Sequence, residues 1–295
     1  MELRHLKYFV AVAEELHFGR AAKRLRMTQQ PLSRQIKDLE EELGVKLFYR
    51  TKRTVRLTEV GAIFLAETRK TLQQAEYAVH IVRQAQQGKI GKLTIGFTGS
   101  ALNIVLPAVV RQFKQLFPQV ELILKRMQTL EQVEALNNRQ IDLGLLHPPI
   151  NNETLNIETI YRENLIAALP DNHFLAKDTS DSISLQQLVN ESFILFPRYL
   201  GSVLYDRIIN TCQQAGFSPK IVQEAIPQQT ILGLVAAEIG ISLIHSSARN
   251  LSRDKVIFKD LIEPTPILET AIAWSSNASN PVLPSFLKIV RQNNF

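Results

Sequence analysis

Apolar residues recur at helical spacing along the first forty residues of the chain, in three successive stripes. Each stripe spans about one short helix, and polar or basic residues fall on the opposite face. The stripes are Leu6, Phe9, Val10, Ala13 and Leu16; Phe18, Ala21, Ala22 and Leu25; and Leu32, Ile36 and Leu39. This pattern predicts a first helix over residues 3–16, packed against two further helices that are separated by a tight break.

The third helix has recognisable boundaries. Thr28 can cap its first turn through the side-chain oxygen. Gln30 and Pro31 lie in that turn, where the missing backbone donor of proline costs nothing. Gly44 ends the helix, since glycine readily adopts the left-handed conformation found there. The residues left on the outer face near the start of the helix are Gln29, Gln30, Ser33, Arg34 and Lys37.

This outer set has the chemistry of a DNA reader. Glutamine can contact adenine with two hydrogen bonds, and arginine can contact guanine in the same way, so Gln29, Gln30 and Arg34 are expected to face bases. Ser33 and Lys37 are expected to face the phosphate backbone mainly. A second helix that presents such residues from its first turns predicts a helix-turn-helix. The alternative is an ordinary helical hairpin with a solvated polar face.

A basic hairpin is predicted directly after the third helix. Residues 45–58 alternate roughly between apolar and polar, which is typical of two short strands. The basic residues at or near its tip are Arg50, Lys52 and Arg53, with Arg56 behind them. Beside a recognition helix this hairpin would act as a wing that contacts phosphate or the minor groove; otherwise it is a solvated basic loop. The acidic run of Asp38, Glu40, Glu41 and Glu42 is expected to point away from DNA.

A long helix follows over residues 59–86, where the chain contains no proline. Leu65, Leu72 and Val79 recur every seven residues, with Thr68, Ala75 and Val82 at the intervening seam positions. Such a heptad pattern predicts a dimerising helix. The alternative is an amphipathic helix that packs on its own domain.

Strands and helices alternate beyond a short glycine-bearing hinge at residues 88–91, which predicts an α/β domain with mostly parallel strands. We expect strands at 93–97, 120–125 and 141–146, with helices at 106–117 and 130–138 between them. A second block of this kind runs over residues 161–263. A strand at 268–274 and a helix at 281–291 follow it.

Charge is concentrated at one end of the chain. The net charge of the 295 residues is +6. Residues 1–90 hold 17 Lys and Arg against 10 Asp and Glu, and residues 91–295 hold 17 against 18. Only the first part is therefore suited to a polyanion such as DNA. A single cysteine, Cys212, and the absence of any long apolar run indicate a cytoplasmic protein without a disulfide or a membrane span.

Candidate ligand-binding residues follow the predicted strands, because open α/β sheets bind ligands beyond the carboxyl ends of their strands. Gly99 and Ser100 follow one strand, Thr129 follows the next and His147 the third. Pro197, Arg198 and Tyr199 follow a strand at 192–196 in the second block. Hydroxyl groups and free N–H groups at helix starts suit a small carboxylate. Alternatively Ser100 and Thr129 are plain helix caps and Arg198 is a surface residue.

No pattern of residues indicates catalysis or metal binding. The six histidines are scattered without metal-ligand spacing, and no nucleophile elbow, P-loop or dinucleotide-binding motif occurs. We therefore expect no enzyme activity, no metal and no cofactor beyond a small organic acid as ligand. Two other functions are less well supported by the sequence: an enzyme acting on small acids, and an architectural DNA-binding protein without a ligand.

The chain resembles the LysR-type transcriptional regulators, most closely over residues 1–65. The run that carries the resemblance is MELRHLKYFVAVAEELHFGRAAKRLRMTQQPLSRQIKDLEEELGVKLFYRTKRTVRLTEVGAIFL. The later pieces LTIGFTGSA, FPQVELILKRMQT, IDLGLLHPP and ILGLVAAEIGISLIHSS are most similar to the branch that regulates aromatic-acid catabolism and acetoin synthesis. In relatives that sense carboxylic acids, the positions of Ser100 and Thr129 hold the acid group, and the position of His147 varies.

The resemblance implies a domain order and an assembly. A winged helix-turn-helix would occupy residues 1–58, a dimerisation helix 59–87, the hinge 88–91 and an effector-binding domain 92–295. That domain would have two lobes like a periplasmic binding protein, lobe I at 92–161 and 268–295 and lobe II at 162–267. The implied assembly is a homodimer, and further a homotetramer, on double-stranded DNA with an interrupted inverted repeat. RNA polymerase is a possible further partner.

Overall fold

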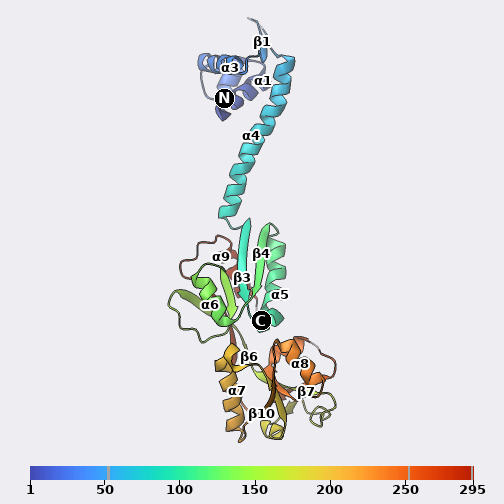
Figure 1. Cartoon of the computed structure of the whole chain (residues 1–295). Coiled ribbons are helices and arrows are strands. Elements are labelled where there is room, and N and C mark those ends of the chain that lie inside the picture. Colours follow the sequence, from blue (N-terminus) through green and yellow to red (C-terminus); the bar gives the residue numbers. More distant parts are fainter. Residues whose placement is uncertain (52–53, 252, 294) are drawn as a thin grey trace. The chain divides into compact units, whose positions relative to one another are not determined.

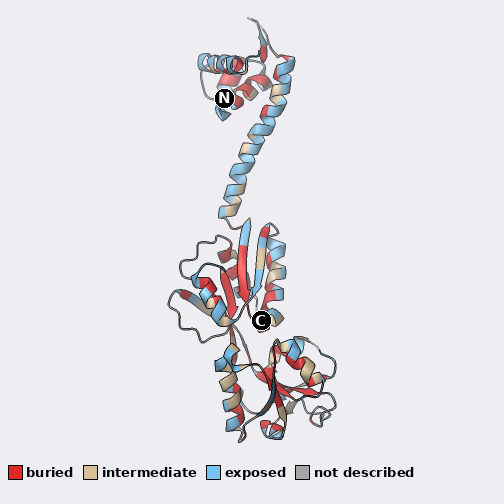
Figure 2. Cartoon of the chain, in the orientation of Figure 1, coloured by how far each residue is buried: buried red, intermediate tan, exposed pale blue. Residues whose placement is uncertain are grey.

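The computed structural model describes residues 1–51, 54–251, 253–293 and 295, and it divides into two compact units (Figure 1). The first unit is Met1–Gln84 and the second is Ala85–Phe295. Each unit buries its own apolar core, which is coloured red in Figure 2.

The first unit is a bundle of short helices with a hairpin. Local signals in the sequence set its helix boundaries: Leu16 in the left-handed conformation ends the first helix, and Gly44, with φ of 70°, ends the third. His17 caps the second helix, because its Nδ1 accepts hydrogen bonds from the N–H groups of Gly19 and Arg20. The elements are α1 (Leu3–Glu15), α2 (Phe18–Arg24), α3 (Gln29–Leu43), β1 (Phe48–Arg50), β2 (Val55–Leu57) and α4 (Glu59–Gln86).

Aromatic rings hold this unit together. Phe9 of α1 lies 5.4 Å from Phe48 of β1 and 4.9 Å from Phe64 of α4, measured between ring centroids. The first turn of α4 approaches the hairpin so closely that a side chain at Gly61 would collide with the carbonyl oxygen of Leu47. The hairpin is therefore packed between α1 and the start of α4.

The second unit begins with a five-stranded sheet, which with its helices forms lobe I. The strand order is β4-β3-β5-β13-β6. The elements are β3 (Gly91–Phe97), α5 (Gly99–Leu116), β4 (Val120–Arg126), α6 (Thr129–Asn137), β5 (Leu143–Leu146), β6 (Leu155–Glu163), β13 (Leu268–Ser275) and α9 (Leu283–Gln292). Helices α5 and α9 pack together through Phe113 and Phe286, whose ring centroids are 5.2 Å apart.

Lobe II follows β6. It contains a second sheet, of strand order β11-β7-β12-β8, and a two-stranded parallel sheet, β10-β9. A parallel bridge between Phe193 and Ile241 joins the pair to the chain just before β11. The elements are β7 (Leu165–Pro170), β8 (Ser182–Ile183), η1 (Leu185–Leu188), β9 (Ser192–Leu195), η2 (Arg198–Leu200), α7 (Ser202–Gln214), β10 (Lys220–Glu224), α8 (Gln228–Ala236), β11 (Ser242–His245), η3 (Ser246–Leu251) and β12 (Val256–Leu261).

Two sequence-based expectations about the second unit need correction. The sheets are mixed rather than mostly parallel, because β13 returns from lobe II and runs antiparallel between β5 and β6. Helix α5 starts at Gly99 and not near Leu106, so Pro107 lies inside it. Pro107 is exposed, and the buried Ala101 and Val105 in the added turns pack on the sheet, which offsets the hydrogen bond that proline removes.

Candidate DNA-binding surface and effector cleft

Helix α3 presents the predicted recognition residues at its surface. Gln29, Gln30, Pro31, Arg34 and Lys37 are exposed, and Ser33 is half-buried. The same helix buries Leu32, Ile36 and Leu39 in the core, so the polar side is the one available to a partner. Arg34 has no ion-pair partner in the described part of the chain, whereas Lys37 lies 3.2 Å from Glu41, one turn further along.

Thr28 occupies the N-cap position of α3, as predicted, but its side chain makes no capping hydrogen bond. Its hydroxyl is exposed and remains available for a phosphate. The side-chain cap expected there is instead found one helix earlier, at His17. Sequence reasoning missed His17 because histidine is not among the usual capping residues.

The wing is anchored by a buried carboxylate. Glu40 is 3% exposed, and its Oε1 accepts hydrogen bonds from the N–H groups of Leu47 (2.8 Å) and Phe48 (3.1 Å). Unlike its acidic neighbours Asp38, Glu41 and Glu42, Glu40 is buried and faces the hairpin backbone, which would otherwise have two unpaired donors. Its Oε2 lies 2.7 Å from Nη2 of Arg50, whose guanidinium also lies over the Phe18 ring at 4.9 Å.

The predicted basic residues of the wing differ in how far they reach into solvent. The side chain of Arg50 is 28% exposed and is held on the protein rather than extended into solvent. Arg56 is exposed on β2. Lys52 and Arg53, also expected to contact DNA, lie outside the described residues.

The predicted seam of α4 is partly exposed within the single chain. Thr68 is buried, Leu65 and Leu72 are half-buried, and Val79 is 52% exposed. Val82 is 67% exposed. An apolar row on a 28-residue helix that becomes more exposed along its length is suited to a second helix.

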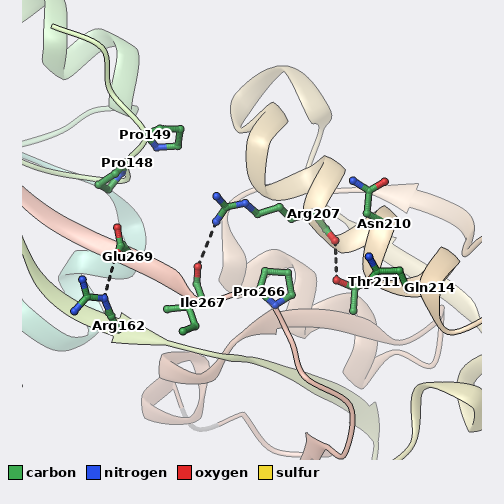
Figure 3. Close-up of a pocket in the computed structure, with 10 residues that line it drawn as sticks. All are labelled: Pro148, Pro149, Arg162, Arg207, Asn210, Thr211, Gln214, Pro266, Ile267 and Glu269. Atoms are coloured by element: carbon green, nitrogen blue, oxygen red, sulfur yellow. Dashed lines mark hydrogen bonds and ion pairs between the residues drawn. The ribbon is translucent and has the colours of Figure 1, made fainter.

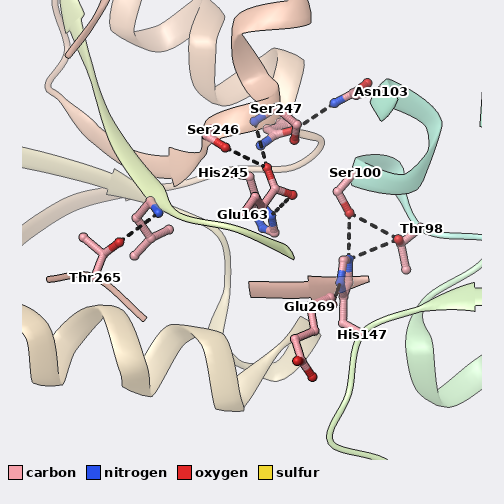
Figure 4. A network of polar contacts seen from close by, with 12 residues as sticks. Thr98, Ser100, Asn103, His147, Glu163, His245, Ser246, Ser247, Thr265 and Glu269 are labelled. Atoms are coloured by element: carbon pink, nitrogen blue, oxygen red, sulfur yellow. Dashed lines mark hydrogen bonds and ion pairs between the residues drawn. The ribbon is translucent and has the colours of Figure 1, made fainter. Parts of the chain in front are cut away.

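In lobe I, three side chains from different elements meet at the end of the sheet (Figure 4). Nε2 of His147 lies 2.7 Å from Oγ of Ser100 and 3.1 Å from Oγ1 of Thr98, and the two hydroxyls are 3.2 Å apart. Ser100 sits in the first turn of α5, whose N-cap position is held by Thr98. The Ser100 hydroxyl therefore contacts a side chain across the sheet and does not act as a helix cap.

The ring of His147 has a defined orientation. Nδ1 lies 2.8 Å from the backbone carbonyl oxygen of Glu269, which can only accept, so Nδ1 carries a proton. In the neutral ring Nε2 has one lone pair and accepts from the nearer hydroxyl, that of Ser100, and the Thr98 hydroxyl can then donate to the Ser100 oxygen. Burial, together with the nearby His245, lowers the pKa of His147 to about 4, which keeps the ring neutral at pH 7.

Thr129 joins the same cluster through the backbone. It is the first residue of α6, and its Oγ1 accepts a hydrogen bond of 3.2 Å from the N–H of His147. The structure thus brings Ser100, Thr129 and His147 together, and Gly99 begins α5 directly before Ser100.

His245 on β11 of lobe II and Glu163 at the end of β6 lie on the facing side of this cluster. The rings of His147 and His245 are 5.8 Å apart, and Nδ1 of His245 lies 3.2 Å from the buried carboxylate of Glu163. Burial by itself raises the pKa of Glu163, but the hydrogen bonds from His245 and from the N–H of Ser247 (2.8 Å) outweigh it, so the pKa lies below the usual value. The sequence assigned no site role to His245 or Glu163, because their relation to His147 depends on how the lobes face each other.

Two amide contacts also join the lobes. Nδ2 of Asn103 donates to Oε1 of Gln228 (3.2 Å), and Nδ2 of Asn250 donates to the backbone carbonyl of Asn103 (3.3 Å). Asn103 of α5 therefore contacts the start of α8 and η3, while the histidine pair joins the end of β5 to β11.

The remaining predicted ligand residues make no hydrogen bond to this cluster among the described residues. Arg198 makes a two-pronged ion pair with Asp206, with Nε and Nη2 each 2.7 Å from a carboxylate oxygen. Tyr199 is 80% exposed, and Pro197 precedes the short helix η2 that carries both. No described hydrogen bond connects these three residues with Ser100 or Thr129.

A pocket of about 650 Å³ in the same unit contains none of the predicted ligand residues (Figure 3). It is lined by Pro148, Pro149, Arg162, Arg207, Asn210, Thr211, Gln214, Pro266, Ile267 and Glu269. Glu269 connects this pocket to the cluster of Ser100, Thr129 and His147, because its backbone carbonyl accepts a hydrogen bond from the His147 ring. In the described ranges no group of three metal-ligating side chains occurs, and no helix there is both long and apolar enough to cross a membrane.

A helix-turn-helix with a wing, a long following helix and a two-lobed α/β unit define the class of protein: a DNA-binding regulator with a substrate-binding domain. Comparison with known proteins supports the same class. Residues 3–62 match the family model for the bacterial regulatory helix-turn-helix protein, lysR family, and residues 86–294 match the LysR substrate binding domain. The chain belongs to the LysR family of transcriptional regulators.

The similarity to known regulators covers nearly the whole chain. It is 43% identical to the HTH-type transcriptional regulator AlsR of Bacillus subtilis, over 98% of this chain and 95% of that one. It is 35% identical to CatR of Pseudomonas putida, over 99% of each. Full-length CbnR in complex with target DNA superposes with a TM-score of 0.84 at 28% identity, covering 99% of both chains. All three are regulators, and this protein is likewise a DNA-binding regulator and not an enzyme.

Proposed function

We propose that this protein regulates transcription in the cytoplasm in response to a small carboxylate bound between its two lobes. The observation that carries the proposal is the meeting of Ser100, Thr129 and His147 at the carboxyl ends of β3 and β5. A carboxylate there would receive hydrogen bonds from two hydroxyls and from N–H groups in the first turns of α5 and α6. The positive ends of both helix dipoles favour a negative charge at this place.

The ligand would also act on the contact between the lobes. The Ser100 hydroxyl is hydrogen-bonded to His147, whose ring faces His245 of lobe II. A carboxylate that accepts a hydrogen bond from Ser100 would therefore remove a hydrogen bond from His147. Binding would then favour one arrangement of the lobes, by no more than the difference in ligand affinity between the arrangements. Gly99 would allow close approach of the backbone, while Pro197, Arg198 and Tyr199 would contribute only if the lobes close further.

On DNA, the exposed face of α3 would read bases and the wing would hold phosphates. Gln29, Gln30 and Arg34 suit base edges, whereas Ser33, Lys37 and Thr28 suit the backbone. The α4 seam would pair two chains, and a dimer of dimers would span an interrupted inverted repeat, since a two-fold protein reads a two-fold site. RNA polymerase would be the partner that senses the resulting change on DNA.

Calorimetric titration with small carboxylic acids, beside melting curves, tests the proposal. Charge-assisted hydrogen bonds are worth roughly 1.5–3 kcal/mol each, so Ser100→Ala and Thr129→Ala should each weaken binding of a responsive acid about ten- to a hundredfold. Ser285→Ala, at a helix start in lobe I outside the cleft, is the control and should leave binding unchanged. Lower melting temperatures with unchanged affinity would contradict the proposal.

A further inference from the structure

The 650 Å³ pocket of the second unit has walls from both lobes (Figure 3). Pro148 and Pro149 follow β5, and Arg162 and Glu269 belong to β6 and β13, all in lobe I. Helix α7 of lobe II forms the other side. The pocket therefore changes its shape if the lobes move, although it includes neither Ser100 nor Thr129.

One face of α7 supplies a polar wall with unused hydrogen-bonding capacity. Arg207, Asn210, Thr211 and Gln214 are spaced by three or four residues and so share that face. Thr211 is satisfied, since its hydroxyl donates to the Arg207 carbonyl at 2.8 Å. The guanidinium of Arg207 has only one long contact, 3.4 Å to the Ile267 carbonyl, and no carboxylate at ion-pair distance in the described part of the chain. Within the same part, the amides of Asn210 and Gln214 have no hydrogen-bond partner.

The opposite wall adds a second guanidinium and an apolar floor. Arg162 binds Glu269 through Nε at 2.8 Å, which leaves its two terminal nitrogens to other partners. Pro148, Pro266 and Ile267 supply hydrocarbon surface between the two arginines. The charged side chains lining the pocket are two arginines and one glutamate, so the pocket has an excess of positive charge and of N–H donors.

We propose that this pocket is a second ligand site, separate from the cleft at Ser100, and that it takes a small organic carboxylate. Arg207 would bind the carboxylate with two parallel hydrogen bonds, the geometry in which guanidinium and carboxylate match best. Asn210 and Gln214 would donate to further oxygens, and the prolines and Ile267 would cover the carbon chain. Inorganic phosphate would satisfy the charge but not the apolar floor, so the pocket should prefer the carboxylate.

A ligand in this pocket would affect the arrangement of the two lobes, as a ligand in the cleft would. The ligand would bridge α7 to the β5–β6 connection, and the backbone of Glu269 already holds the ring of His147. Any ligand with unequal affinity for two lobe arrangements shifts their populations, and linkage then makes the two sites affect each other equally. The second site is thus a means of tuning the response.

Isothermal titration of the full-length protein with succinate tests the proposal. The titration is made in a Ser100→Ala background, so that binding at the cleft and at this pocket are separated. Arg207→Gln should weaken succinate binding about ten- to a hundredfold by removing a charge-assisted pair. Arg207→Lys keeps the charge without the two parallel bonds and should fall between. Arg139→Gln, an exposed arginine of lobe I outside the pocket, is the matched control and should not change binding.

The outcomes separate this site from the proposed cleft. Succinate binding that survives Ser100→Ala but is lost in Arg207→Gln supports the second site. Binding that depends on Ser100 and is indifferent to Arg207 overturns the second site while leaving the cleft intact. Absence of succinate binding in the Ser100→Ala protein, or phosphate binding as tightly as succinate, also overturns it.

Discussion

The buried carboxylate of Glu40 determines how the wing is held on α3. It accepts two backbone hydrogen bonds and faces the guanidinium of Arg50, which also stacks on Phe18. A buried charge that loses its partner is costly, because water cannot replace the partner. Arg50 therefore has a structural role in addition to any contact with phosphate.

Arg50→Ala is expected to lower the free energy of unfolding of the first unit by about 1–3 kcal/mol, because the buried Glu40 carboxylate loses one of its hydrogen-bond partners. Lys46→Ala is the control: Lys46 lies 3.9 Å from the same carboxylate with a 70% exposed side chain, and its loss should cost about 0.5 kcal/mol or less. Urea unfolding of both variants measures this. Unchanged stability with weaker binding to all DNA would instead make Arg50 a phosphate contact.

The ring of His147 makes stability of the second unit depend on pH. The unfolded chain binds a proton at His147 near pH 6.5, and the folded chain binds it only near pH 4. Acid therefore favours unfolding: the contribution is complete above pH 6.5 and is lost as the pH falls from 6.5 to 4. The free energy of unfolding lost by pH 4 amounts to about 1–3 kcal/mol.

Unfolding curves at pH 5 and pH 7.5 test this contribution. His147→Gln should flatten the pH dependence, whereas His80→Gln, on the exposed face of α4, should leave it as in the parent. Glu163 loses its own contribution as the pH falls from 4.5 toward its lowered pKa, which is below the two pH values compared, and it does so in every variant. Parallel pH profiles of the parent and the His147→Gln protein would refute the role given to His147.

At the scale of elements, α3 is the helix that we propose reads the DNA sequence. Its first turns are exposed while its other face is buried, so a base contact is open to Arg34 without rearrangement. Arg34→Ala should cost about 1–3 kcal/mol on the specific site and less on random DNA, since guanine contacts exist only in the specific complex. Lys37→Ala should weaken both similarly. Equal losses for Arg34→Ala on both DNAs, measured by fluorescence anisotropy, would rule out base reading.

Helix α4 is the element that would pair two chains. Leu72 is half-buried in the single chain and lies on the row that ends at the exposed Val79. Leu72→Asp would place a charge in an apolar seam, which is costly when buried, so loss of the dimer and of operator binding is expected. Gln73→Asp, one residue along and exposed, is the control. An intact dimer of Leu72→Asp in sedimentation experiments would place the seam elsewhere.

For the molecule as a whole, the two units should unfold separately because each has its own apolar core. Calorimetric scanning should show two transitions. Operator DNA at a hundred times its Kd should stabilise only the first unit, by about 2.7 kcal/mol, or on the order of 10 °C for a domain of this size. One transition that DNA moves as a whole would show that the units are coupled.

Much of the architecture follows from the sequence alone. The helices α1 to α4, the turn before α3, the glycine that ends it and the basic hairpin all come from local periodicity and capping, which depend on neighbours within a few residues. The bounds of α4 are those predicted, Glu59–Gln86. Ser100, Thr129 and His147 could be named because each follows a strand, and the carboxyl edge of such a sheet is a common ligand site.

Other features were decided only by the tertiary structure. Glu40 belongs to an acidic run in sequence, and only the packed hairpin turns it into a buried anchor. The bond between His147 and the backbone of Glu269 joins positions 122 residues apart, and it exists because β13 returns to lobe I beside β5. Such pairings depend on the path of the whole chain, so periodicity, which records only the burial of one face, does not contain them.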